Sequence, residues 1–189
     1  MKKEGGSLLL LNKRRMIISG KRAQVWIETA MYILIATVII GLVISFVGPK
    51  ISEMLDKAIL ENSATMLRDL DNIISSIVQD GAGNVRKIEL PLKKGALTIN
   101  SPSDKIVFEM EGRYAYSEPG KPITQGSLTI YTRQTGNINT VNMTSSYPNY
   151  NITFNGEDQV KSISQASNPY TVYITNQGGS KPVINFEIK

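Results

Sequence analysis

Residues 29–49 read TAMYILIATVIIGLVISFVGP and contain no charged side chain. An α-helix rises about 1.5 Å per residue, so roughly 20 apolar residues cross a hydrocarbon core about 30 Å thick. The apolar run from Val25 to Val47 has that length. The sequence therefore predicts one membrane-spanning helix near the N-terminus, with the lipid bilayer as a partner.

A basic leader precedes this run and sets its orientation. Only Glu4 opposes its seven basic residues, which are Lys2, Lys3, Lys13, Arg14, Arg15, Lys21 and Arg22. The positive-inside rule places this end in the cytoplasm and the rest of the chain outside the cell. From Gln24 on, 14 Lys and Arg face 15 Asp and Glu, because the leader holds seven of the 21 basic and one of the 16 acidic residues. That part shows no basic stripe, so no nucleic-acid partner is predicted.

The composition narrows the classes of function. The chain of 189 residues has neither Cys nor His. Disulfides and thiolate metal sites are excluded, and the commonest zinc ligand and proton-transfer group is missing. We therefore predict no metal, no other cofactor and no enzymatic activity, and one soluble domain of ordinary size beyond the anchor.

The leader differs from a removable secretory signal. Such a signal has an apolar stretch of about 7–15 residues followed by a small-residue cleavage site. Here the apolar run is longer and ends in Gly48-Pro49-Lys50. The alternative is a cut before the apolar segment, which would leave the helix at the new N-terminus.

Residues 21–28 read KRAQVWIE and resemble the processing site of archaeal type IV pilins with class III signal peptides. In that family a prepilin peptidase cuts directly before a Gln, and an acidic residue is fifth in the mature chain. The resemblance implies a cut between Ala23 and Gln24 and makes Glu28 that fifth residue. Against the family pattern Q-x-S-x-E-x-x-x-L, Trp26 replaces Ser and Tyr32 replaces Leu. The resemblance covers residues 21–59.

The resemblance implies a structural subunit, a pilin or pseudopilin, of a type IV pilus-like surface filament. Its implied partners are the prepilin peptidase, copies of itself or related pilins, and the pilus assembly machinery. The alternative is a single-pass adhesion or binding domain that keeps its leader and does not polymerise. A carboxylate-dependent hydrolase is a third class, without a supporting motif.

Glu28 needs a physical reason to lie in an apolar helix. An ionised carboxylate near the bilayer centre costs about 3 kcal/mol. One interpretation is that Glu28, near the start of the run, reaches cytoplasmic water. The other is that it pairs with the new α-ammonium group of Gln24, in its own chain or a neighbour's, within a helix bundle. Trp26 and Tyr32 are predicted to lie at the membrane interface, where aromatic side chains are enriched.

Two features of the following segment predict a second helical part. Gly48-Pro49 predicts a kink or a short break. Apolar residues then recur at helical spacing and form a stripe, namely Ile51, Leu55, Ile59, Met66, Leu70, Ile73 and Ile77. This helix is predicted to end at Asp80-Gly81, and its stripe packs either on the domain's own sheet or on a helix of another subunit.

From Val85 the apolar period becomes two, which predicts half-buried strands. Seven runs show it: Ile88/Leu90, Leu97/Ile99, Ile106/Phe108/Met110, Leu128/Ile130, Tyr150/Ile152/Phe154, Val172/Ile174 and Ile184/Phe186/Ile188. The predicted fold class is α+β, with a long N-terminal helix and an antiparallel, sandwich-like β head. Residues 135–168, rich in Asn, Thr and Ser, are predicted to be long surface loops.

The predicted segments are a leader (1–23), a membrane helix (24–47), an amphipathic helix (48–80) and a β-rich extracellular head (84–189). Asn142 and Asn151 each begin an N-x-[ST] pattern, a possible N-glycosylation acceptor. Glu109 and Glu111 share a face of one strand, and we interpret that face as solvent-exposed.

Overall fold

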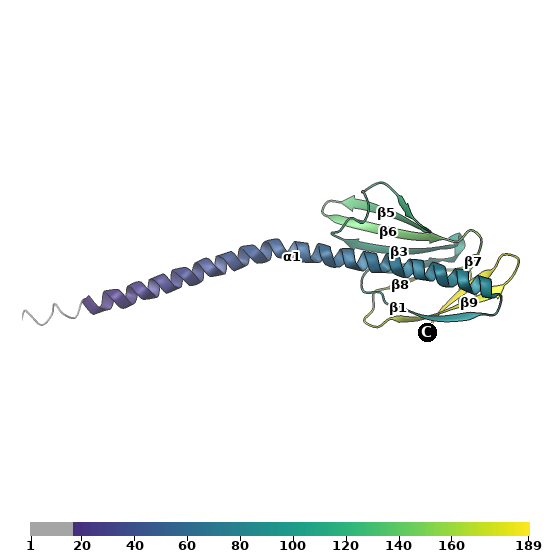
Figure 1. Cartoon of the computed structure of the whole chain (residues 1–189), viewed down its shortest axis with the longest axis horizontal. Coiled ribbons are helices and arrows are strands. Elements are labelled where there is room, and N and C mark those ends of the chain that lie inside the picture. Colours follow the sequence, from purple (N-terminus) through teal and green to yellow (C-terminus); the bar gives the residue numbers. More distant parts are fainter. Residues whose placement is uncertain (1–16) are drawn as a thin grey trace, which may run out of the picture. The chain divides into compact units, whose positions relative to one another are not determined.

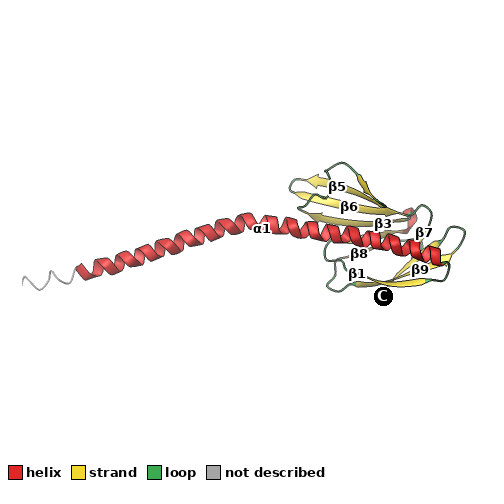
Figure 2. Cartoon of the chain, viewed as in Figure 1, coloured by secondary structure: helices red, strands yellow, loops and turns green. Residues whose placement is uncertain are grey.

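The computed structural model describes the backbone from Ile17 to Lys189 and the side chains from Gln24 on. Most of the predicted leader, and the Ala23 side chain at the predicted cut, therefore lie outside the described residues. One long helix, α1 (Ile17–Asp80), precedes all the strands (Figure 2). The chain divides into two units, with the boundary between Lys50 and Ile51.

Pro49 lies inside α1, and the helix is assigned without interruption on both sides of it. Of the two predicted alternatives at Gly48-Pro49, the short break does not occur, and the kink stays a prediction. Proline removes the N–H that would bind the carbonyl four residues earlier, at Ser45, but one missing bond does not require the flanking turns to unwind.

The part of α1 beyond Lys50 packs on the strands of its own unit, which confirms the first interpretation of its stripe. The stripe itself is displaced from the predicted one. Leu70 and Ile77 are buried as predicted, whereas Ile51 and Leu55 are exposed and Ile59, Met66 and Ile73 are only partly buried. The fully buried row consists of Leu60, Ala64, Leu67, Leu70, Ile74 and Ile77.

The strands form two sheets. The six-stranded sheet has the order β4 (Ile123–Gln125), β5 (Leu128–Thr135), β6 (Ile138–Ser146), β3 (Lys105–Gly112), β2 (Ala96–Asn100) and β8 (Val160–Ser164), all antiparallel. The four-stranded sheet has the order β1 (Val85–Leu90), β9 (Tyr170–Gly178), β10 (Val183–Ile188) and β7 (Asn151–Phe154). The predicted α+β fold is thus confirmed, although β7 and β10 pair in parallel.

Three strands were not predicted: β4, β6 and β8. The prediction of long surface loops over residues 135–168 is wrong, because β6 lies inside the larger sheet between β5 and β3, and β7 and β8 also fall in this range. In β6 the side chains of Val141, Met143 and Ser145 alternate inward. The buried Ser145 and the Asn and Thr residues around them obscure that period in the sequence.

One hydrophobic core joins the helix to both sheets. Figure 1 shows this part of α1 running along the strands, with β5 and β6 to one side of it and β1 and β9 to the other. The sheets contribute the alternating inward residues of their strands, among them Leu97, Ile106, Phe108, Met143, Val172, Ile174, Ile184 and Phe186. Burial of such side chains stabilises the fold by about 1.5–3 kcal/mol each.

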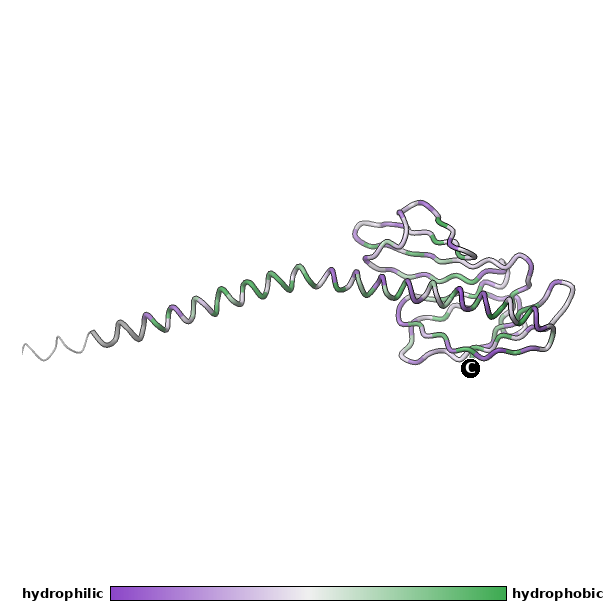
Figure 3. Tube along the Cα trace, in the orientation of Figure 1, coloured by the Kyte–Doolittle hydropathy of each residue, from purple (hydrophilic) through white to green (hydrophobic). Residues whose placement is uncertain are grey.

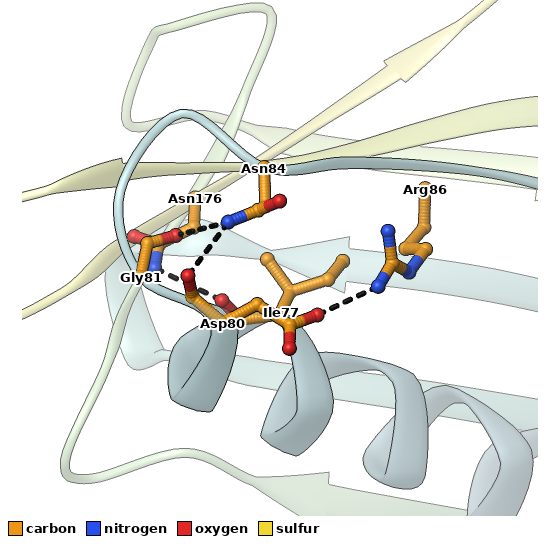
Figure 4. A network of polar contacts seen from close by, with 6 residues as sticks. All are labelled: Ile77, Asp80, Gly81, Asn84, Arg86 and Asn176. Carbon is orange, nitrogen blue, oxygen red and sulfur yellow. Dashed lines mark hydrogen bonds and ion pairs between the residues drawn. The ribbon is translucent and has the colours of Figure 1, made fainter.

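The predicted end of the helix at Asp80 is confirmed by a polar network (Figure 4). Gly81 has φ +94°, a conformation that costs glycine little. The Asn84 amide donates to the carbonyls of Asp80, at 2.8 Å, and Gly81, at 3.1 Å. The buried Asn176 amide of β9 donates to the Ile77 carbonyl at 3.3 Å. These bonds satisfy last-turn carbonyls that would otherwise lack partners.

Candidate functional site

The predicted membrane helix is exposed along residues 24–47. Its large apolar side chains range from 45% exposed at Val47 to 80% at Phe46. Figure 3 shows apolar residues predominating along this part of α1, which among the described residues is the one helix long and apolar enough to cross a membrane. An apolar surface this long needs lipid or protein to cover it, and the chain therefore fits a single-pass membrane protein.

The Thr and Ser hydroxyl groups of this helix form hydrogen bonds within it. Thr29 donates to the Val25 carbonyl at 2.9 Å, Thr37 to the Ile33 carbonyl at 2.8 Å, and Ser45 to the Gly41 carbonyl at 3.0 Å. A hydroxyl without a partner costs several kcal/mol in hydrocarbon, at about 4–8 kcal/mol on a cyclohexane scale. The three side chains therefore do not oppose burial of the helix in lipid.

Glu28 differs from these hydroxyl residues because its carboxylate has no partner among the side chains that the structure describes. The side chain is exposed, and the residues from Gln24 on offer it no hydrogen bond or ion pair. Gln24 lies four residues before it in the same helix, so both residues are on one face. A cut before Gln24 would create an α-ammonium group about one helical turn from the carboxylate.

The other predicted positions of this helix are also exposed. Trp26 is 76% and Tyr32 is 71% exposed, and their spacing of six residues places them on different sides of the helix. Gly41 and Ser45, four residues apart, share a face, and a Cβ at Gly41 would meet no atom within 4 Å. That face is open to close approach by a second helix.

The two glycosylation candidates lie in different surroundings. Asn142 is half-buried within β6, paired with Glu109 of β3 and Tyr131 of β5. Asn151 is exposed at the first position of β7, and the Thr153 hydroxyl of its pattern is buried and donates to Asn185 Oδ1 at 3.1 Å. Asn151 is therefore the more accessible acceptor.

The predicted strand carboxylates face solvent in the described structure. Glu109 and Glu111 are both exposed on β3, which confirms the predicted solvent-facing strand face. Within the described residues, no group of three acidic side chains comes together that could hold a metal ion.

The buried carboxylate of Asp56, which the sequence analysis did not identify, connects α1 to the larger sheet by hydrogen bonds. Asp56 is 5% exposed and accepts hydrogen bonds from Lys94 Nζ at 2.6 Å and from the Arg113 backbone N–H at 2.7 Å. A Cβ at Gly112 would come within 2.6 Å of the carboxylate. Asp56 lies four residues before Leu60, the first residue of the buried row. This helical spacing was the sequence signal that Asp56 lies on the buried face.

A groove of about 560 Å³ runs between α1 and the connection from β1 to β2. The partly buried Ile59, Met66 and Ile73 line it on the helix side, and Ile88 and Pro91 line it on the strand side. This position explains why part of the predicted apolar stripe is incompletely buried.

Comparisons with protein-family models, with curated proteins and with solved structures found no match to this chain.

Proposed function

We propose that this chain is a structural subunit of a type IV pilus-like surface filament of the archaeal kind. It is anchored in the membrane before assembly, and its N-terminal helix forms the contacts of polymerisation. The observation that supports the proposal most is that two features occur together in α1. These are an exposed apolar surface over residues 24–47 and one carboxylate, Glu28, four residues after Gln24.

The mechanism begins with insertion of the apolar helix, with its basic leader in the cytoplasm and the head outside. A membrane peptidase then removes the leader between Ala23 and Gln24. The assembly machinery finally transfers the helix from lipid into a bundle of like helices. Since the lipid tails are as apolar as the side chains they cover, the transfer gains little hydrophobic free energy. Helix packing, charge pairing and the machinery must supply the rest.

Charge pairing of Glu28 favours the transfer of the helix from lipid into the bundle. In lipid, both the carboxylate and the new α-ammonium group carry a desolvation cost. Within one subunit the two groups lie about one helical turn apart, and in a bundle each also meets the opposite charge of neighbouring subunits, where the low dielectric strengthens the attraction. The assembled state is thereby favoured over the isolated subunit in the bilayer.

The first experiment is N-terminal sequencing and intact-mass measurement of the chain recovered from sheared surface filaments. The proposal expects Gln24 as the first residue. A chain that retains Met1, isolated from membranes and never from filaments, would instead assign the non-polymerising single-pass domain.

A further inference from the structure

We propose that the free edge of β1 pairs with β1 of a second copy of this chain, in antiparallel orientation and around a two-fold axis that passes beside Ile88. Lys87 of each copy then faces Glu89 of the other. This pairing goes beyond the proposed function and requires neither removal of the leader nor polymerisation.

β1 is an edge strand whose outer backbone groups have no partner. It ends the four-stranded sheet, with β9 on its other side. The Asn176 N–H of β9 donates to the Asn84 carbonyl at 3.0 Å, which continues the register of the two strands. Because antiparallel strands bond through every second residue, the even-numbered residues of β1 bond to β9. The backbone groups of Lys87 and Glu89 therefore point to the free edge, where the described residues supply no hydrogen bond.

The side chains of β1 alternate between core and solvent. Ile88 is partly buried and Leu90 is buried, whereas Lys87 and Glu89 are exposed. Among the described residues, neither Lys87 nor Glu89 forms an ion pair. Two opposite charges without a partner thus lie two residues apart on the outward face of a free edge.

This order of charges selects a second copy of β1 as the partner. When Lys87 and Glu89 of two antiparallel copies are opposite each other, each of the two equivalent pairs can exchange both backbone hydrogen bonds. The side chains of each pair then attract across the strands, and Ile88 faces Ile88 at the centre. A register centred on Lys87 would instead place like charges opposite each other, which is unfavourable.

The other three edge strands lack this pattern. β4 and β7 contain no charged residue, and β8 contains only Lys161. A single lysine on an edge strand opposes pairing between copies, because it meets no opposite charge. β1 is therefore the edge on which the charges favour a copy of the same strand.

The surface beside β1 leaves space for an added strand. Ile88 and Glu89 line the groove described above on the strand side, and Met66 and Ile73 line it on the helix side. A second strand would cover part of this apolar surface. β1 has only six residues, and the following Pro91 has no N–H to extend the ladder. The contact is therefore weak between free chains and gains strength where many copies are held side by side.

The two-fold axis also sets the relative direction of the two helices. β1 runs back along α1, since Arg86 bonds to Asp80 at the helix end and Leu90 lines the groove with Ile59. Antiparallel β1 strands therefore place the two α1 segments over residues 51–80 in opposite directions. Subunits of one filament all point the same way, so in the proposed filament this contact joins copies from separate filaments. That last step alone rests on the proposed function.

The experiment uses the absence of native cysteine. The full chain with Ile88→Cys is purified in detergent and oxidised mildly, and the disulfide-linked dimer is quantified on a non-reducing gel. At the proposed centre the two Cα atoms lie about 4.5 Å apart, within the range that a disulfide spans. Val160→Cys is the control for random collision, because Val160 is 57% exposed at the start of the edge strand β8.

Charge reversal tests the register in the Ile88→Cys background. Lys87→Glu and Glu89→Lys each place two like charges on the edge, and we expect either one alone to lower the dimer yield about fivefold or more. An equimolar mixture of the two variants should restore the yield, because each copy then meets opposite charges. The double reversal within one chain should restore it too. Circular dichroism checks that every variant folds alike.

A dimer yield from Ile88→Cys no greater than that from Val160→Cys would overturn the pairing. A yield that survives both single reversals, or one that the mixture fails to restore, would overturn it as well. These measurements need no filament, so their failure leaves the proposed function intact. Conversely, a chain that never assembles into filaments but gives the expected pattern of dimer yields would support the pairing alone.

Discussion

At the scale of single residues, the carboxylates of Glu28 and Asp71 differ in their exposure to solvent. Glu28 is exposed on the apolar helix, whereas Asp71 is half-buried where α1 meets the larger sheet. The buried Tyr147 donates its hydroxyl to Asp71 Oδ1, and Oδ2 is buried with no hydrogen-bond partner among the described residues. Burial raises the pKa of Asp71, and the Tyr147 hydrogen bond offsets this only in part.

Replacement of Glu28 by Gln should leave membrane insertion unchanged and reduce filament yield strongly. The amide keeps the shape of the side chain but cannot pair with an α-ammonium charge. Electron microscopy and quantification of sheared filaments measure the effect, with membrane fractionation as the insertion readout. Glu61→Gln, another exposed glutamate of α1, is the matched control and should assemble normally. Normal filament yield from the Glu28 variant would argue against charge pairing.

Asp71→Asn should stabilise the head near neutral pH and flatten its pH dependence. Because the pKa of Asp71 is raised in the folded chain, there is a pH window in which the folded chain holds this proton and the unfolded chain has lost it. The free energy of unfolding therefore falls as the pH rises through this window. Above the folded pKa, the ionised carboxylate destabilises the fold. We expect a gain of about 1 kcal/mol at neutral pH. The gain should shrink as the pH approaches about 4, the ordinary pKa of Asp.

Pulse proteolysis of the full chain in detergent, across this pH range, measures that free energy of unfolding. Asp69→Asn is the control, because Asp69 is exposed two residues away on the same helix. If the Asp71 variant followed the wild-type curve, the carboxyl would titrate normally.

At the scale of elements, the sequence predicted the features that depend on local pattern. The span, the helix end at Gly81 and seven of the strands follow from apolar period and turn residues. The parallel pairing of β7 with β10 depends on where distant strands meet, which no local period encodes. The inward period of β6 was hidden because Ser145 is buried without being apolar.

The buried row of α1 was displaced for a related reason. Ile51 and Leu55 have the correct spacing for a core stripe, yet they remain exposed. Asp56 lies on the buried face instead, because Lys94 and the Arg113 N–H neutralise and bind its carboxylate. Pairing partners so distant along the chain cannot be identified from helical spacing alone. The same limit applies to the site, where spacing located Glu28 but not Asp56.

Two Leu→Ala substitutions on α1 test this assignment of faces. Leu67→Ala should cost about 2–5 kcal/mol, because Leu67 is fully buried and its loss leaves a cavity. Leu55→Ala should change stability by less than about 0.5 kcal/mol, since Leu55 is 59% exposed. Denaturant unfolding of the full chain in detergent measures both. Similar costs at the two positions would show that the buried face is misassigned.

At the scale of the whole molecule, the helix is part of the head as well as its anchor. The unit that begins at Ile51 contains the six buried helix residues together with both sheets. Five of the six are Leu or Ile, and each of these contributes about 1.5–3 kcal/mol when fully buried. Their combined contribution is comparable to the typical net stability of a domain, about 5–15 kcal/mol. The strands alone therefore lack a sufficient core.

A fragment of residues 51–189 should fold as a soluble domain, and a fragment of residues 84–189 should not. Dispersed amide resonances and a cooperative thermal transition are expected for the first fragment and absent from the second. Addition of a peptide covering residues 51–83 to the shorter fragment is the control, and recovery of dispersed resonances would attribute the loss to the missing helix. A cooperative transition from residues 84–189 alone would contradict this account of the core.

The core row of α1 also has a mechanical consequence. Tension on the membrane segment reaches the head through this helix, so the buried residues from Leu60 to Ile77 together hold the segment to both sheets. A strand peeled from a sheet edge would instead yield one bond at a time. A head built this way should hold its shape while its tail is dragged out of a bilayer.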